Sequence, residues 1–390
     1  MGVFNLEKLA LLISSRMGTL LIDHQRCSRV RSPLSNCSYC TNTCPVDALS
    51  FSNEGIDINR NCIDCGLCAG VCPTGALITQ EPTELALLDK LISIDKKQGT
   101  AIISCRPQKA LAPKGVLISC MGCLSWELLL ALDAVSFPVY VVQSAEKCVS
   151  CPVTSGGEQF IKQLKTSRAI SARLGIPQGA IQILSKAPEI KAVSKENTAD
   201  PSRRAFFSSI FSGAKQVPKS IINDVLGEPV EEEQIIKIKI ADGTDTSRLR
   251  LLKQALKGNL KEKVKENEVA ACENNFEKFE ELRQAELAST CYFCNACSIL
   301  CPLGALKQTE DNQLILDTGK CTGCKLCVEV CVHKSLTLMP SNLNQILQAE
   351  KKILAQGIED KCQKCEQPTI SSEPKELCFI CERNALWYNK

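Results

Sequence analysis

The sequence predicts an α+β multidomain chain in which two cysteine-rich modules flank an α/β domain and a small four-cysteine tail follows. Three observations support this fold class. Eight cysteines recur with nearly the same spacing towards each end, strands alternate with helices between them, and two close cysteine pairs end the sequence. Because only 4% of the residues are aromatic, several small modules are favoured over one large core.

The 26 cysteines among 390 residues are several times the usual share. Such use indicates either a small secreted disulfide scaffold or metal binding in a reducing compartment. The chain is too long for the first, and many cysteines stand two or three residues apart, where disulfides are geometrically awkward. Charged residues interrupt the apolar start, no secretory signal follows, and no apolar run approaches the roughly 20 residues of a membrane span. We therefore expect a cytoplasmic metal-binding protein.

The most informative run lies in the predicted module 286–340. It consists of Cys291, Cys294, Cys297 and Cys301, followed by Cys321, Cys324, Cys327 and Cys331. In each half, two residues separate the first three cysteines and three residues precede the last. This spacing is typical of thiolates that hold cubane [4Fe–4S] clusters, with the fourth cysteine crossing to the other cluster. The run therefore predicts two cubanes.

A second copy lies in the predicted module 1–82, after an amphipathic helix and a strand at 19–22. Its second half is complete, with Cys62, Cys65, Cys68 and Cys72, but its first half offers only Cys37, Cys40 and Cys44. Leu34 stands where the first cysteine belongs, and leucine cannot ligate iron. Cys27 is the predicted substitute, because the nine residues up to Cys37 form a loop that can fold back. The alternative is a three-iron or unligated site.

The substitution predicts how the thiolates divide between two clusters. One cluster has Cys27, Cys37, Cys40 and Cys72, and the other has Cys44, Cys62, Cys65 and Cys68. Short strands at 48–51 and 56–58, and again at 305–306 and 314–316, recur in both copies with a turn between them.

Proline follows Cys44, Cys72 and Cys301, and Val332 replaces it after Cys331. With these residues, each copy resembles the bacterial two-cluster ferredoxins over about 50 residues. The resemblance implies that each module is a one-electron carrier and that the chain holds about four [4Fe–4S] clusters.

Residues 83–190 alternate strands and helices, which predicts a parallel sheet with covering helices. Five cysteines belong to this α/β domain: Cys105, Cys120, Cys123, Cys148 and Cys151. Three of them follow predicted strands, where open α/β sheets place their ligands. The two Cys-x2-Cys pairs can supply four thiolates for an iron–sulfur cluster or a zinc ion, which leaves Cys105 spare or competing for one position. A set of free buried cysteines is the alternative. The arrangement is similar in outline to a small iron–sulfur subunit of methanogen-type hydrogenases.

Residues 191–285 are expected to form a charged, partly helical linker that ends in a helix over 276–288. Residues 341–390 are expected to contain a helix over 344–356 and a zinc-ribbon-like tail. Its four cysteines are Cys362, Cys365, Cys378 and Cys381, two Cys-x2-Cys pairs of the kind that hold structural Zn2+. Rubredoxin-like iron is the alternative, but the glycines typical of that site are absent.

These motifs predict a polyferredoxin-like electron carrier of anaerobic metabolism, which relays single electrons between donor and acceptor oxidoreductases as a subunit of a larger complex. No membrane span is expected in the chain itself, and a membrane-bound complex as the partner stays open. The net charge is only +3, and positive and negative residues are interspersed along the chain, so the sequence gives no support for a nucleic-acid partner. Two other functions stay open. The middle cysteines could hold a catalytic centre, or the tail could dock a partner while the clusters sense redox state.

Overall fold

The computed structural model describes residues 20–52, 55–79, 82–97, 99–135, 137–174, 176–188, 251–252, 279–341 and 343–388. All of these except Pro188 belong to one compact unit, composed of Thr19–Ala187 and Thr244–Lys390. The helix expected before residue 19 lies outside the described residues. Of the linker expected over 191–285, only residues 251–252 and 279–285 are described.

Two pairs of short antiparallel strands frame the N-terminal module. They are β1 (Leu20–Ile22), β2 (Leu49–Ser52), β3 (Gly55–Ile58) and β4 (Leu77–Thr79). β1 pairs with β4, and β2 forms the predicted hairpin with β3. The segments between them form short helices, namely η1 (His24–Arg26), α2 (Ser28–Arg31), α3 (Tyr39–Thr43) and α4 (Leu67–Val71). The β1–β4 pair brings the beginning and the end of the module together, which places Cys27 near Cys72 although the two are distant in sequence.

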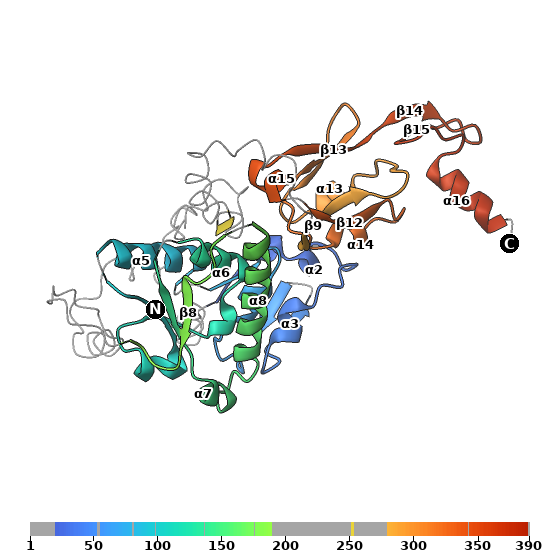
Figure 1. Ribbon diagram of the computed structural model, residues 1–390. Coiled ribbons are helices and arrows are strands. Elements are labelled where there is room, and N and C mark those ends of the chain that lie inside the picture. The colour runs from blue at the N-terminus through green and yellow to red at the C-terminus, as the bar shows by residue number, and fades with distance from the viewer. Residues whose placement is uncertain are drawn as a thin grey trace, which may run out of the picture. The chain divides into compact units, whose positions relative to one another are not determined.

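The α/β domain contains the predicted parallel sheet, with strand order β6-β5-β7-β8 (Figure 1). The strands are β5 (Ala101–Cys105), β6 (Val116–Ile118), β7 (Val139–Val142) and β8 (Ile181–Leu184). Three longer helices accompany the sheet: α5 (Glu84–Lys96), α6 (Trp126–Asp133) and α8 (Gly156–Leu174). Every residue of β5 is buried, as expected for a central strand that is covered on both faces.

Three short helices follow the carboxyl ends of the parallel strands. They are η2 (Arg106–Leu111) after β5, η3 (Met121–Cys123) after β6, and α7 (Ala145–Val149) after β7. The cysteines of the domain lie in or beside these three segments, at the edge of the sheet where ligands are commonly bound.

The C-terminal module repeats the strand pairing of the N-terminal one. Its strands are β9 (Phe279–Leu287), β10 (Leu306–Gln308), β11 (Gln313–Asp317), β12 (Leu336–Ser341) and β13 (Lys351–Gln356). β9 pairs with β12 as β1 pairs with β4, and β10 pairs with β11, which also pairs with β13. Its helices are α13 (Ala296–Leu300), α14 (Leu326–Glu329) and α15 (Leu343–Gln348). The turn before β11 contains Asn312 at a φ of 56°.

Two helix predictions in this part of the chain are wrong. The helix expected over 276–288 is strand β9 in its described part, because Leu282 and Gln284 are buried while Glu281 and Arg283 are exposed. This alternation has the period of a strand. The helix expected over 344–356 ends at Gln348, and β13 begins three residues later.

The tail consists of a hairpin and a last helix (Figure 1). The hairpin joins β14 (Ile358–Lys361) to β15 (Pro368–Ser371), and the helix is α16 (Phe379–Tyr388). Within the described part of the chain, no helix combines the length and the apolar character needed to cross a bilayer.

Candidate metal centres

Four cysteines share one local geometry. In each case the thiol sulfur accepts a hydrogen bond from the backbone N–H four residues later. The pairs are Ala48 to Cys44 (3.3 Å), Ala76 to Cys72 (3.3 Å), Ala305 to Cys301 (3.2 Å) and Ser335 to Cys331 (3.2 Å). These are the last cysteines of the four half-motifs. An N–H donor stabilises the thiolate form, which is the form that ligates iron.

One cavity of the N-terminal module is lined by Cys44, Cys62, Cys65 and Cys68, hereafter the Cys44 set. Cys44 follows α3, whereas the other three precede or belong to α4. The fourth thiol of this set therefore comes from the opposite half of the motif, as the crossover pattern predicts.

The second set of the N-terminal module is Cys27, Cys37, Cys40 and Cys72, hereafter the Cys27 set. Cys27, Cys40 and Cys72 are buried in one small core. Burial raises the pKa of Cys40 to about 12, and the charges of Cys72, Cys37 and Cys27 contribute to this rise. The side chain of Leu34 is 55% exposed, whereas Cys27 is 7% exposed. The structure thus brings Cys27, and not residue 34, to the other three thiols.

The C-terminal module has two cavities that are lined by cysteines. One is lined by Cys301, Cys321, Cys324 and Cys327, hereafter the Cys301 set. The other is lined by Cys291, Cys294, Cys297 and Cys331, hereafter the Cys291 set. In both cavities the last cysteine of one half joins the first three of the other half.

In the α/β domain, Cys105, Cys120, Cys148 and Cys151 lie near one another, and we call them the middle set. Burial raises the pKa of Cys105, and the charges of Cys148 and Cys151 raise it further. Burial also raises the pKa of Cys120 to about 12, with contributions from the charges of Cys105 and Cys151. Cys105, which the sequence left either spare or competing for one position, thus lies close to the other three.

Cys123 has a different place. A Cβ atom added to Gly70 of α4 would lie 2.6 Å from the Cys123 carbonyl oxygen, so only glycine fits there. A Cβ atom added to Gly66 would lie 3.1 Å from the Cβ atom of Cys123. Cys123 therefore packs against the N-terminal module.

Two glutamine side chains, which the sequence interpretation did not single out, contact the middle set. The Nε2 atoms of Gln108 and Gln143 donate to the Cys148 sulfur at 3.3 and 3.5 Å. Gln108 is held in place because its Oε1 accepts from the Ser144 N–H at 2.7 Å. Both glutamines follow strands of the parallel sheet, at the same edge as the cysteines. That position is the signal that could have identified them.

The spacing of the thiols separates two kinds of site. A tetrahedral ion with zinc–sulfur bonds of about 2.3 Å holds its thiolates about 3.8 Å apart, whereas a cluster spreads them wider because they bind different metals. Among the described residues, one group has all its ligand atoms within 4.8 Å of one another. It is Cys362, Cys365, Cys378 and Cys381, hereafter the tail set. Among the described residues, none of the other five sets brings three of its sulfurs this close together.

The tail set also has the charge distribution of a metal site. The sulfurs of Cys365 and Cys378 are 3.8 Å apart, the distance expected around a single tetrahedral ion. The backbone N–H of Cys378, together with those of Cys365 and Lys364, lowers the pKa of Cys362 to about 6. These backbone donors stabilise the thiolate form of Cys362, which is the form that binds a metal ion.

The tail also packs against the Cys291 loop. The Cys291 N–H donates to the Ser372 hydroxyl at 2.9 Å, and the Ser372 N–H donates to the Cys291 carbonyl at 2.8 Å. The Tyr292 hydroxyl donates to Glu382, beside Cys381. The ring of Phe379 meets His333 edge-on, with centroids 3.9 Å apart.

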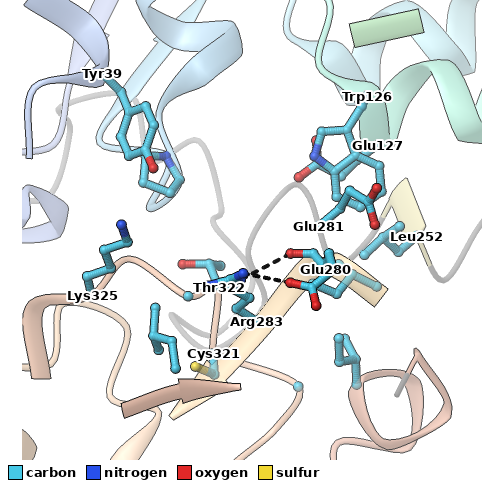
Figure 2. Close-up of a pocket in the computed structure, with 16 residues that line it drawn as sticks. Tyr39, Trp126, Glu127, Leu252, Glu280, Glu281, Arg283, Cys321, Thr322 and Lys325 are labelled. Atoms are coloured by element: carbon cyan, nitrogen blue, oxygen red, sulfur yellow. Dashed lines mark hydrogen bonds and ion pairs between the residues drawn. The ribbon is translucent and has the colours of Figure 1, made fainter. Parts of the chain in front are cut away.

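A cavity of about 350 Å³ borders the Cys301 set (Figure 2). Tyr39 and Trp126 line one side, and Lys325 and Cys321 line the other. Glu280 and Arg283 form an ion pair at its wall, with a separation of 2.6 Å. This arrangement places residues of both ferredoxin-like modules and of the α/β domain around one opening.

Residues 35–76 match the family model of the 4Fe-4S dicluster domain. The chain is 28% identical over 88 residues to a subunit of the selenate reductase of Mesobacillus selenatarsenatis, covering 21% of this chain and 30% of the relative. It is 27% identical over 104 residues to the thiosulfate reductase electron transfer subunit of Salmonella typhi, covering 26% and 47%. The chain thus spans less than half the length of either relative.

No solved structure matches the chain. An uncharacterized ferredoxin of Methanocaldococcus jannaschii is 36% identical over 45 residues, which are 11% of this chain and 73% of that ferredoxin. The dicluster match and this coverage agree with the paired cysteine sets of the N-terminal module, and the chain therefore belongs to the ferredoxins.

Proposed function

We propose that this protein is an electron carrier with four [4Fe–4S] clusters, two in each ferredoxin-like module, and a further iron–sulfur cluster on the middle set. It accepts single electrons from one oxidoreductase and delivers them to another, as a subunit of a larger complex. The relatives named as reductase subunits support this role. So many thiolate ligands require a reducing compartment, and we propose the cytoplasm of an organism with anaerobic metabolism.

The observation that carries the proposal is the recurrence of the N–H to sulfur hydrogen bond at Cys44, Cys72, Cys301 and Cys331. Each of these cysteines completes a set of four in which three thiols come from the other half of its module. Burial and mutual repulsion raise the pKa of several of these thiols, including Cys297 and Cys324, to about 12. Iron relieves both penalties because it neutralises the thiolates.

Metal analysis of anaerobically purified, full-length protein tests the cluster number. Four cubanes require about 16 iron atoms and as many inorganic sulfides per chain, and a cluster on the middle set adds to that number. Dithionite reduction should produce the EPR signals of [4Fe–4S] clusters. Fewer than about eight iron atoms would contradict the four-cluster proposal.

For the tail set we propose one structural Zn2+, which keeps the hairpin and α16 in place beside the Cys291 loop. The protein should contain one zinc per chain that survives removal of the iron. Replacing Cys378 by serine should release it, since a three-thiolate site binds more weakly. A Cys378→Ser variant that keeps its zinc would contradict the assignment.

One observation favours a second function, in which the middle set is the catalytic centre of an oxidoreductase subunit. Cys148 and Gln143 line an open groove of about 970 Å³. A Cys148→Ser variant would then lose turnover while the four cubane signals remain, whereas a pure carrier has no turnover to lose. The carrier is the simpler proposal, because a relative named as an electron transfer subunit supports it, whereas the groove alone supports the second function.

A further inference from the structure

The N-terminal module differs from the C-terminal one by an insertion after its first ligand. Nine residues separate Cys27 from Cys37, whereas two separate Cys291 from Cys294. β1 ends five residues before Cys27 and β9 ends four residues before Cys291, so both cysteines hold the same place relative to the first strand. The extra length therefore lies within residues 28–36, which include α2.

This insertion contacts the C-terminal module. The Arg31 guanidinium donates to the carbonyl oxygens of Ile299 and Leu300, the latter at 3.4 Å. The Asn36 N–H donates to a carboxylate oxygen of Glu329 at 3.2 Å. Ile299 and Leu300 end α13, just before Cys301, and Glu329 ends α14 between Cys327 and Cys331. The insertion thus binds the end of α13, directly before Cys301, and the end of α14, which contains Cys327, and both cysteines belong to the Cys301 set.

These contacts bring thiols of different modules together. Tyr39 and Lys325, which lie close in sequence to Cys37 and Cys324, line the same cavity (Figure 2). Asn36, whose N–H donates to Glu329, directly precedes Cys37. The Cys27 set therefore lies beside the Cys301 set.

A second junction joins the N-terminal module to the middle set. Cys120 is buried in one apolar cluster with Leu67 and Val153, and Cys65 packs against that cluster. The close approach of α4 to η3 at Gly70 keeps these groups together, and Gln163 of α8 donates to the Gly70 carbonyl at 3.5 Å. The Cys44 set therefore lies beside the middle set.

We propose that the five centres form one unbranched series: the middle set, the Cys44 set, the Cys27 set, the Cys301 set and the Cys291 set. The insertion at 28–36 is the junction that connects the two ferredoxin-like modules. This inference rests on the proposed function. Each transfer moves one electron, so that one cluster is oxidised as its neighbour is reduced, and no bond forms or breaks. A one-electron reductant, dithionite in the test below, supplies the first electron.

The double variant Arg31→Ala/Glu329→Ala tests the junction. Its matched control is Lys307→Ala/Glu310→Ala, which removes the same charges from exposed positions of the C-terminal module. In the dithionite-reduced full-length protein, neighbouring reduced clusters broaden each other's EPR signals at low temperature. The double variant should keep the wild-type iron content and lose the broadening between the Cys27 and Cys301 sets, while the control keeps it. Unchanged broadening in the double variant overturns the inference.

Removal of each terminal centre tests the order, and it remains informative if the double variant does not fold. Cys148→Ser should remove the middle signal and narrow only the signal of the Cys44 set. Cys294→Ser should remove the signal of the Cys291 set and narrow only that of the Cys301 set. The proposed series is wrong if removal of a terminal centre narrows the EPR signal of a set that is not its neighbour in the series. It is also wrong if Cys148→Ser removes no EPR signal. A low iron content in the wild type would instead contradict the proposed function.

Discussion

The N-terminal and C-terminal modules have the same strand pairing and the same N–H to sulfur contacts, yet they differ around their first cysteine. In the C-terminal module, Cys291 is two residues from Cys294 and its loop is held by the tail. In the N-terminal module, Cys27 is followed by an insertion that contacts the C-terminal module. The comparison indicates that the position of the first cysteine depends on where the first strand ends. The loop that follows this cysteine can differ in length and can make other contacts.

The largest expected effect comes from removing the first ligand in each module. Cys27→Ser and Cys291→Ser should each lose one cubane, about four iron atoms, because three thiolates hold a cubane poorly. Iron and sulfide analysis of both variants measures this loss. A Cys27→Ser variant with full iron content would show that the N-terminal module uses another ligand. Adding Leu34→Cys to Cys27→Ser should not restore the iron, since that side chain is exposed to solvent.

The next effect concerns the tail. Among the described hydrogen bonds, the tail contacts the Cys291 loop of the C-terminal module, and it does not contact Cys27. Release of the tail zinc by Cys378→Ser should open this loop, because its two backbone-anchored bonds contribute about 1 kcal/mol each. Loss of iron from the Cys291 set in air should then become on the order of tenfold faster. The N-terminal module is the internal control, and equal acceleration in both modules would contradict this prediction.

In the middle set, two glutamine side chains donate to the Cys148 sulfur, and each of these donors can be removed singly. Gln108→Ala deletes a donor to Cys148, so the reduced, more negative centre loses stabilisation. Its reduction potential should fall on the order of 60 mV, the equivalent of about 1.4 kcal/mol for one electron. A redox titration followed by EPR measures the shift, with the cubane potentials as reference. A rise in potential would exclude this role for Gln108.

The smallest effect concerns the second residue after the crossing cysteine, which is Thr74 in one module and His333 in the other. The Thr74 hydroxyl lies 3.6 Å from the Cys72 sulfur and is buried. Thr74→Val should lower the potential of the Cys27 set on the order of 30 mV, because a weak hydrogen bond to the thiolate is lost. The Cys291 set should keep its potential. An unchanged Cys27 set would show that the hydroxyl does not interact with the thiolate.

The spacing of the cysteines predicted the crossover in both modules, because a short tight loop leaves few ways to direct three thiols inward. The alternation of residues predicted β1 and the hairpins β2–β3 and β10–β11, but it predicted neither β4 nor β12, and β9 was expected to be a helix. It could not decide between Cys105 and Cys123, since both lie beside short helical segments at the same edge of the sheet. That difference depends on the approach of Gly66 and Gly70, which are remote in sequence.

The two wrong helix predictions have a common physical cause. The segments 279–287 and 351–356 are rich in Glu, Lys, Gln, Leu and Ala, which favour helices when no partner is considered. Both segments instead pair with strands of the C-terminal module. Pairing with β12 also lets Gln284 donate to the Thr318 carbonyl at 2.8 Å. Ala349, at a φ of 51°, follows the end of α15 before β13 begins. Tertiary pairing outweighed local propensity.

The tail has a consequence for where electrons can leave the chain. Zinc has a filled d shell and no accessible redox state, so the proposed zinc site in the tail would not transfer electrons. It covers the Cys291 loop on the side of Tyr292 and Phe379. Cys294 of the same set is exposed. If this set holds a cluster as proposed, an external redox partner would exchange electrons with this end of the protein at the exposed Cys294 and not through the tail.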